Sequence, residues 1–181
     1  CTKCCIDTTV SGVKFDQSGE CNFCKMHNEL DQEFPLNQQG QKKFKIIIQK
    51  IIKAGRGRKY DCVVGISGGR DGCYTLYLAK KLGLRPLAVH FNDGFGNPVA
   101  GENMTNVTKK LGVDLKTVTS DWRESKDIRV AFLKASTPDL GMPNDLGIAT
   151  ALYSSALQEN IKYVLVGHSF GGKVAGHMSF M

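Results

Sequence analysis

The chain has 181 residues, 41% of them hydrophobic, which is enough for one buried core and a small appended unit. No stretch predicts a membrane span and no charged-then-apolar leader is visible, so we expect a cytoplasmic protein. Lys and Arg number 24 against 17 Asp and Glu, a formal net charge of +7. This excess suits an anionic ligand such as a nucleotide, a nucleotide sugar or RNA, and ordinary solubility explains it equally well.

Four of the seven cysteines form two Cys-x-x-Cys pairs, Cys1 with Cys4 and Cys21 with Cys24, separated by 16 residues. Two such pairs present four thiolates tetrahedrally, as a closed structural Zn²⁺ site requires. Turn-forming residues between short strand-like runs predict a zinc ribbon over residues 1–30. An odd cysteine count without a leader disfavours disulfides. A redox-active pair would be expected to open a helix in a βαβ unit, which this segment does not resemble.

A basic amphipathic segment follows the cysteine pairs. Residues 41–59 place isoleucines on one side of a helix and Lys and Arg on the other. We therefore expect a linker and a connecting helix over residues 31–58, with a nucleic-acid or membrane surface as the second interpretation. The remaining residues, 59–181, are expected to form one domain.

Strand and helix patterns alternate through that domain. The strand-like runs, several of them dense in β-branched or apolar residues, are residues 61–66, 85–91, 114–118 and 162–168. The helical patterns are residues 71–83, 100–112, 124–136 and 145–160. Alternation of this kind predicts an α/β fold, a doubly wound parallel sheet preceded by the small zinc ribbon. Such sheets bind ligands at the carboxyl ends of their strands.

The stretch VVGISGGRDG, residues 63–72, joins the first strand to the helix after it. Gly68 and Gly69 lack Cβ atoms, so backbone N–H groups can approach an anion, and the helix start near Asp71 adds its positive end. Ser67 adds a hydroxyl donor, while Asp71 is placed to cap the loop amides or to hold Mg²⁺ beside phosphates. The loop is therefore predicted to bind phosphate, although it matches neither G-x-x-x-x-G-K-[ST] nor G-x-G-x-x-G.

The pattern S-G-G-x-D at residues 67–71 resembles the pyrophosphate loop (PP-loop) of the ATP pyrophosphatases, with Gly72 where that superfamily has a final Ser. The cysteine pairs, the basic helix, this loop, LAVHFNDGFGN (87–97) and MPNDLGIATALYSSALQENIKYVLVGHS (142–169) together resemble the N-acetyl sugar amidotransferase family. The resemblance extends from residue 1 to about residue 170. It implies a zinc ribbon joined to a PP-loop ATP-binding domain.

The resemblance also implies an activity. In that family ATP adenylates the acetamido group of a sugar, pyrophosphate leaves, and ammonia from a separate glutaminase subunit displaces AMP to give an acetamidino sugar for surface polysaccharide or flagellin glycans. The implied cofactors are ATP, Mg²⁺ and structural Zn²⁺, and the implied substrate is a nucleotide-linked N-acetyl sugar. Ser67 and Asp71 are the implied catalytic residues. The implied nucleotide-binding residues are Ser67, Gly68, Gly69, Arg70, Asp71, Gly72, His90, Asn92, Asp93, Asp145, Gly167 and His168.

Three other functions remain open on the residues alone. Some tRNA-thiolating enzymes also combine cysteine pairs with a pyrophosphate loop, and here Cys62 and Cys73 are the only sulfur-carrying candidates in the second domain. A non-catalytic zinc-ribbon binding module would leave the Ser-Gly-Gly-x-Asp loop unexplained. The segment 167–171 spells G-x-S-x-G around Ser169, the nucleophile elbow of α/β-hydrolases, but no acidic residue follows it in the chain.

Overall fold

The structure is a computed structural model that describes residues 1–168. Its contacts divide this part of the chain into two units, Cys1–Ile46 with His168, and Ile47–Gly167. The elements are α1 (Asn22–Glu33), α2 (Gln38–Ala54), β1 (Cys62–Gly65), α3 (Arg70–Lys81), β2 (Pro86–Asn92), α4 (Pro98–Leu111), β3 (Leu115–Thr119), α5 (Trp122–Lys134), α6 (Met142–Gln158) and β4 (Val164–Leu165). Among these helices none is both long and apolar enough to cross a membrane.

The four strands of the second unit form one parallel sheet in the order β3-β2-β1-β4. The chain enters the middle of the sheet at β1, moves outward through β2 to β3, and then crosses over to β4 on the other side of β1. Such a reversal creates a ligand-binding position at the carboxyl ends of the two strands that flank it, here β1 and β4. The predicted α/β class with a parallel sheet is confirmed.

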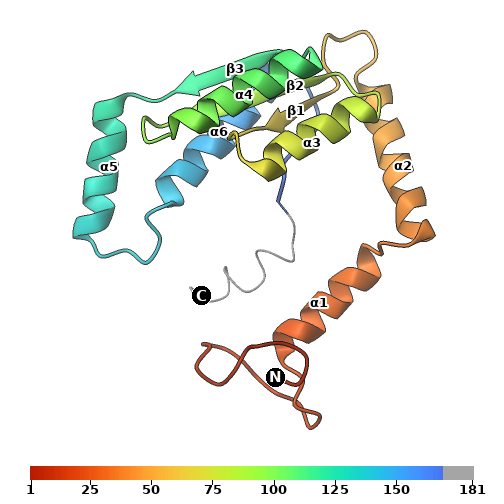
Figure 1. Cartoon of the computed structure of the whole chain (residues 1–181), viewed down its shortest axis with the longest axis vertical. Helices are drawn as coiled ribbons and strands as arrows, with labels where there is room; N and C mark the ends of the chain where they lie inside the picture. The colour runs from red at the N-terminus through yellow and green to blue at the C-terminus, as the bar shows by residue number, and fades with distance from the viewer. Residues whose placement is uncertain (169–181) are drawn as a thin grey trace. The chain divides into compact units, whose positions relative to one another are not determined.

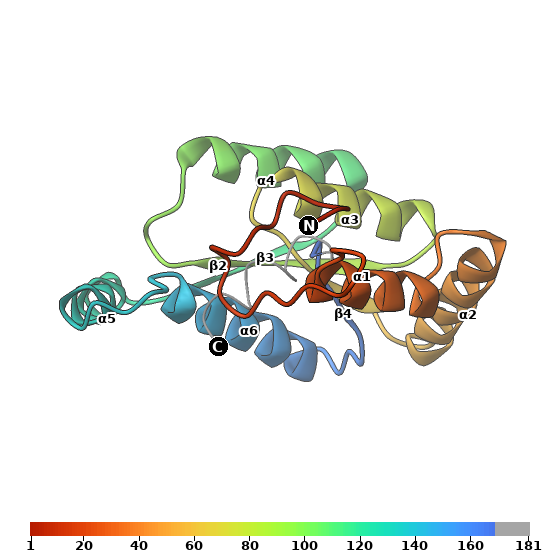
Figure 2. The same cartoon turned by 90° about the horizontal axis from the view of Figure 1, so that it is seen from below.

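Helices cover both faces of this sheet: α3 and α4 lie on one face and α6 on the other (Figure 1 and Figure 2). Successive residues of a strand point to opposite faces, so Val64 packs in the core beneath α3 and α4 whereas Val63 packs in the core beneath α6. Both valines are fully buried. Ile48 and Ile51 of α2 join the first core, so the isoleucine side of the basic helix contributes to the sheet unit.

The predicted strands and helices agree with the observed ones in type and order, and the largest difference in length is at β4. The sequence predicts a strand over residues 162–168, but only Val164 and Leu165 form ladder pairs, with Val63 and Val64 of β1. A strand is defined by its partner, and β1 is itself only four residues long. The residues after β4 instead pass against the start of α3.

Part of the basic excess is used to hold the sheet together at its amino-terminal edge. Asp61, 3% exposed, accepts hydrogen bonds from the backbone and the guanidinium of Arg85. The same guanidinium donates to the carbonyl oxygens of Gly55 and Arg58, which follow α2. Lys59 forms an ion pair of 2.9 Å with Asp114, the residue before β3. These cations therefore bind protein groups, and they lie at the sheet edge opposite the phosphate loop.

Candidate functional site

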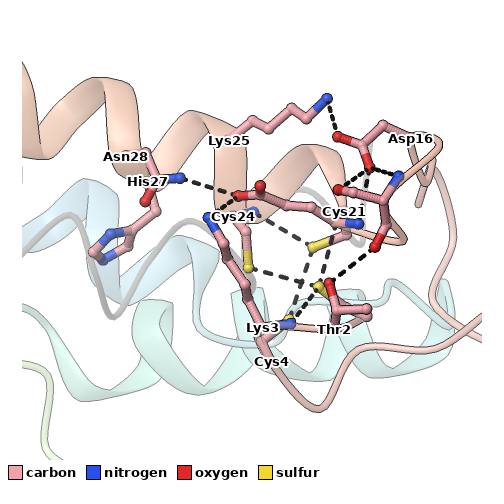
Figure 3. A network of polar contacts seen from close by, with 12 residues as sticks. Thr2, Lys3, Cys4, Asp16, Cys21, Cys24, Lys25, His27 and Asn28 are labelled. Atoms are coloured by element: carbon pink, nitrogen blue, oxygen red, sulfur yellow. Dashed lines mark hydrogen bonds and ion pairs between the residues drawn. The ribbon is translucent and has the colours of Figure 1, made fainter.

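The two Cys-x-x-Cys pairs of the first unit converge on one point (Figure 3). The Sγ atoms of Cys1, Cys4, Cys21 and Cys24 all lie within 4.8 Å of one another. Two of the separations are 3.9 Å, between Cys1 and Cys24, and 3.7 Å, between Cys4 and Cys21. Four sulfurs bound tetrahedrally at 2.3 Å from a central ion would be about 3.8 Å apart. The cluster therefore fits a single thiolate-bound metal ion.

Backbone N–H groups point at these sulfur atoms. Lys3 donates its N–H to Cys1 Sγ at 3.4 Å, Cys21 donates to Cys1 Sγ at 3.3 Å, and Cys24 donates to Cys21 Sγ at 3.4 Å. Burial opposes ionisation of Cys21, yet the hydrogen bonds from Cys24 outweigh it and the pKa of Cys21 is lowered. The hydrogen bond to Cys4, followed by burial, raises the pKa of Cys24 to about 12. Four thiolates this close repel one another, so their joint ionisation requires a cation among them.

One carboxylate organises the loop between the two pairs. Asp16 accepts hydrogen bonds from the backbone N–H groups of Ser18 at 2.8 Å and Glu20 at 3.0 Å, and its other oxygen lies 2.6 Å from Lys25 Nζ (Figure 3). The contact with Lys25, followed by the bond from Ser18, lowers the pKa of the Asp16 carboxyl. Because Lys25 belongs to α1, this network fastens the loop to the helix that carries the second cysteine pair.

The first unit differs from the predicted ribbon in two respects. The predicted strand-like runs contribute only an isolated bridge between Phe15 and Cys21. The intervening loop forms its hydrogen bonds within turns closed by side chains, at Asp7 and Asp16, rather than along a ladder. In addition, Cys21 caps α1 and Cys24 lies within it, so the second pair does open a helix, although outside a βαβ unit. The convergence of all four sulfurs still favours a metal ion over a redox pair.

The predicted phosphate loop lies at the carboxyl end of β1, between that strand and two helices. Gly68 has a φ of +76°, and a Cβ there would lie 2.1 Å from the carbonyl oxygen of Ala100 in the first turn of α4. The side-chain amide of Asn103 donates to the Gly68 carbonyl at 3.2 Å. Gly69 is the N-cap of α3 and supplies no side-chain cap, which leaves the first N–H groups of α3 for another acceptor. The loop is thus held by α4 and opens toward the start of α3.

Three polar side chains stand exposed around this helix start. Ser67 is exposed, the side chain of Arg70 is 93% exposed, and that of Asp71 is 68% exposed. The guanidinium Nε of Arg70 lies 3.2 Å from a carboxylate oxygen of Asp71. All three groups are therefore accessible to a ligand that approaches the N-terminus of α3.

Two glycines allow backbone segments to touch at this site. At Gly72, a Cβ would lie 3.2 Å from the carbonyl oxygen of Gly65 and 3.4 Å from the Cα of Ile66. At Gly167, just after β4, a Cβ would lie 2.8 Å from the carbonyl oxygen of Asp71. The first turn of α3 thus packs directly on the ends of β1 and β4, and Gly167 lies against the loop as the switch in strand order requires. His168, the next residue, is exposed.

The predicted residues at the end of β2 are engaged with neighbouring protein groups. The Nδ1 atom of His90 is 3.1 Å from the carbonyl oxygen of Ile66, a contact between the ends of β2 and β1. Asn92 accepts a hydrogen bond of 3.0 Å from the backbone N–H of Gly94. Asp93 forms an ion pair with Arg129 of α5, and the Asp93 side chain is only 15% exposed. None of these three side chains is directed freely at solvent as the sequence suggested.

Asp145 lies in the first turn of α6 and is exposed. The start of α6 approaches the end of β2 closely, because a Cβ on Gly147 would lie 2.2 Å from the ring of Phe91. Asp145 is therefore at the same end of the sheet as the loop, on the opposite face from α3. The nucleophile elbow around Ser169 lies outside the described residues.

These observations define an α/β protein with a PP-loop-like fold, preceded by a four-cysteine cluster that can hold a metal ion. The contact of Asn103 with the loop could not be found from the sequence, because it depends on where α4 packs. Arg129 carried no sequence signal either, since it lies in an ordinary amphipathic pattern.

Comparison with known proteins supports the fold. No protein-family model matches the chain. The chain is 35% identical over 104 residues to an uncharacterized protein of Methanocaldococcus jannaschii, a match that covers 57% of this chain and 32% of that protein. It therefore spans about a third of the length of the curated relative that it matches.

Two solved structures share the fold. The NH3-dependent NAD synthetase of Campylobacter jejuni, in complex with the nitrate ion, has a TM-score of 0.50 and 22% identity, and the match covers 67% of this chain and 52% of that chain. The U34-tRNA thiolase of Methanococcus maripaludis, with its 4Fe-4S cluster, has a TM-score of 0.51 and 17% identity, over 70% of this chain and 46% of that chain. This chain thus spans about half the length of each.

Proposed function

We propose that the chain is the ATP-binding subunit of an amidotransferase that adenylates the acetamido group of an N-acetyl sugar and replaces AMP with ammonia. The observation that carries this proposal is the Ser67-Gly-Gly-x-Asp71 loop, held by α4 at the carboxyl end of β1 with the uncapped start of α3 beside it. The fold shared with an NH3-dependent NAD synthetase supports it, as does the family resemblance of the sequence.

The proposed reaction has two steps. The acetamido oxygen attacks the α phosphorus of ATP, and the bond from that phosphorus to the bridging oxygen breaks, so that pyrophosphate leaves. Ammonia then adds to the activated carbon, the carbon–oxygen bond breaks to release AMP, and loss of a proton leaves an acetamidino group. Both steps need charge neutralisation and alignment more than covalent participation by the protein.

The residues of this chain supply that neutralisation. The N–H groups at the start of α3 face the position of the pyrophosphate, and the hydroxyl of Ser67 adds a donor. Asp71 presents an exposed carboxylate at the same place and is the residue suited to hold Mg²⁺. When bound, Mg²⁺ offsets the negative charge of the phosphates. Arg70, also exposed, adds a positive charge on the same side.

The remaining components of the proposal concern metal and partners. We propose Zn²⁺ for the four-cysteine cluster, because sulfur atoms 3.7 to 3.9 Å apart suit one tetrahedral ion. A cluster of four irons would hold its cysteine sulfurs farther apart, although the tRNA thiolase with this fold contains one. A glutaminase subunit supplies the ammonia, and the acceptor is a nucleotide-linked N-acetyl sugar.

Replacing Asp71 tests the proposal. The protein is incubated with Mg-ATP, ammonium and a panel of nucleotide-linked N-acetyl sugars, and AMP plus pyrophosphate are separated from ADP plus phosphate. We expect sugar-dependent AMP and pyrophosphate from the native chain. The Asp71→Ala variant should lose at least about 100-fold in rate, the typical effect of removing one group that stabilises transition-state charge. Its fold should persist, because Asp71 is 68% exposed.

The matched control is Asp127→Ala, which removes an exposed carboxylate from α5 and should leave turnover unchanged. Full turnover by Asp71→Ala would contradict the assignment of the loop. Formation of ADP and phosphate instead of AMP and pyrophosphate would contradict the reaction class.

Sulfur transfer to tRNA is the second candidate, because a tRNA thiolase shares the fold and the net charge suits RNA. It needs a reactive thiol near the loop. Burial raises the pKa of the Cys62 thiol to about 12, and burial also raises the pKa of Cys73. Both thiols are therefore protonated at neutral pH, which is unfavourable for a sulfur carrier.

Cysteine labelling distinguishes the two candidates. At neutral pH we expect a maleimide to modify the exposed Cys5 first and Cys62 only after unfolding. Because the pKa of Cys73 is raised, its thiolate fraction grows only as the pH rises, so its labelling rate should increase through the alkaline range. Mass spectrometry of digested protein gives the three rates. Rapid labelling of Cys73 at neutral pH would instead favour sulfur transfer.

A further inference from the structure

Two aromatic side chains form an exposed pair beyond the ends of β2 and β3. Phe95 belongs to the loop after β2, and Trp122 is the first residue of α5, which follows β3. Their ring centroids are 4.8 Å apart and the rings are tilted by 45°. Phe95 is 49% exposed and Trp122 is 50% exposed. Both rings therefore offer surface at the carboxyl-end edge of the sheet, where the phosphate loop also lies.

The surrounding residues hold this pair in place. Gly94 has a φ of +84°, and a Cβ there would lie 2.5 Å from the Trp122 ring, so the backbone packs against the indole. The guanidinium of Arg129 lies 4.1 Å from the centroid of the Phe95 ring, and Asp93 binds the same guanidinium. At the other ring, Asp121 caps α5 by accepting hydrogen bonds from the backbone next to Trp122. The aromatic pair is thus fixed by packing and charge.

The engaged polar groups leave base recognition to these rings. The sequence suggested Asn92 and Asp93 as contacts for the adenosine, but Asn92 closes a turn onto Gly94 and Asp93 is paired with Arg129. The β2 loop therefore presents Phe95, rather than a polar side chain, to a ligand. An aromatic face binds any nucleobase by stacking, and it needs no hydrogen bond from the side chain.

The order of the strands places the pair in line with the phosphate loop. The loop follows β1, Phe95 follows β2 and Trp122 follows β3, and these strands are neighbours in the sheet. Adjacent strands lie about 4.8 Å apart, so Trp122 stands roughly 10 Å from the loop across the edge of the sheet. A nucleotide with its phosphates on the loop would extend its ribose and base along this edge.

We propose that Phe95 and Trp122 are a stacking platform for the adenine ring of ATP, with Gly94, Asp93 and Arg129 as the residues that position it. This inference rests on the proposed function, since it assumes that ATP binds at the loop. It adds what that proposal lacks, namely the residues that recognise the base.

Trp122 is the only tryptophan in the chain, so its fluorescence reports on this platform directly. The full-length protein is titrated with Mg-ATP, AMP and tripolyphosphate. We expect ATP and AMP to quench the emission through stacking, and tripolyphosphate to compete with ATP without quenching by itself. Phe95→Leu and Trp122→Ala should each weaken ATP binding, measured by calorimetry, by about tenfold, while Trp122→Phe should keep most of the affinity.

Tyr153→Leu is the matched control, because Tyr153 is an aromatic residue on α6 with 63% exposure. Its ATP affinity and Trp122 quenching should equal those of the native chain. The proposal is overturned if ATP binds in competition with tripolyphosphate while the emission and the affinity of Trp122→Ala stay unchanged. It is also overturned if ATP does not bind, or if a nucleotide sugar alone quenches Trp122 and ATP does not. Quenching by ATP without formation of AMP and pyrophosphate would instead reject the proposed reaction and retain the platform.

Discussion

Removal of the metal ion from the four-cysteine cluster is expected to unfold the first unit and leave the second unit folded. Among the described residues of the first unit, the buried hydrophobic side chains are those of Cys21 and Phe23 alone. A core this small cannot offset the conformational entropy of the ordered chain. Thiolate coordination of Zn²⁺ contributes on the order of 10 kcal/mol in small zinc domains, so the metal would supply most of the folding free energy.

The expected loss is measurable in α1. This helix has 12 residues, which is too short to persist alone in water. Chelation should therefore lower the helical circular dichroism signal and open residues 1–33 to protease. The second unit has its own two cores and should resist cleavage. Persistence of α1 and of protease resistance after complete metal removal would show that the cysteines do not hold the unit together.

Cys4 and Cys5 provide a matched pair of substitutions for the same prediction. Cys4 lies in the cluster, whereas its neighbour Cys5 is exposed and outside it. Cys4→Ser should reduce bound zinc and destabilise α1, while Cys5→Ser should change neither. Metal analysis of the purified protein also settles the ion, because an iron–sulfur cluster would bring iron and acid-labile sulfide.

Most of the α/β architecture could be predicted because its signals are local. Buried strands appear as apolar runs and helices as amphipathic patterns, and the glycines after β1 mark the loop wherever the helices pack. The four-cysteine cluster was equally accessible, since ligand spacing alone predicts convergence. The observed Sγ distances agree with that spacing.

The details that failed depend on tertiary partners. Residues 162–168 contain enough apolar side chains for a full strand, but only two of them find partners on β1. Asn92 and Asp93 were expected to face a ligand, and no pattern in the sequence indicates that Arg129, 36 residues further on, pairs with Asp93. The helix at Cys21 was missed because its first turn is defined by a sulfur cap and by Asp16, and neither is part of an apolar period.

The Gly68→Ala substitution is expected to disable the phosphate loop. Gly68 is buried, and its φ of +76° lies in the region that side chains strain to adopt, at a cost of about 1 to 2 kcal/mol. The new methyl group would also lie 2.1 Å from the backbone oxygen of Ala100, where no flexible side chain can yield. Overpacking of this kind costs about 1 to 3 kcal/mol. We expect the free energy of unfolding of the second unit to fall by about 3 kcal/mol.

The same substitution should reduce ATP turnover more than it reduces stability. The methyl group can be accommodated only if α4 and the loop move apart, which would also strain the bond from Asn103 and shift the N–H groups that face the phosphates. Gly69→Ala is the matched control, because Gly69 has an extended backbone with a φ of −77°, and its Cβ would lie 3.5 Å from the Ser67 hydroxyl, an ordinary contact. Its free energy of unfolding should stay within about 0.5 kcal/mol of the native value. Chemical denaturation and AMP release measured on both variants separate the outcomes: equal stability and equal turnover would mean that contact with α4 does not shape the loop, and loss confined to Gly68→Ala would mean that the left-handed turn at Gly68 is what presents the α3 amides to pyrophosphate.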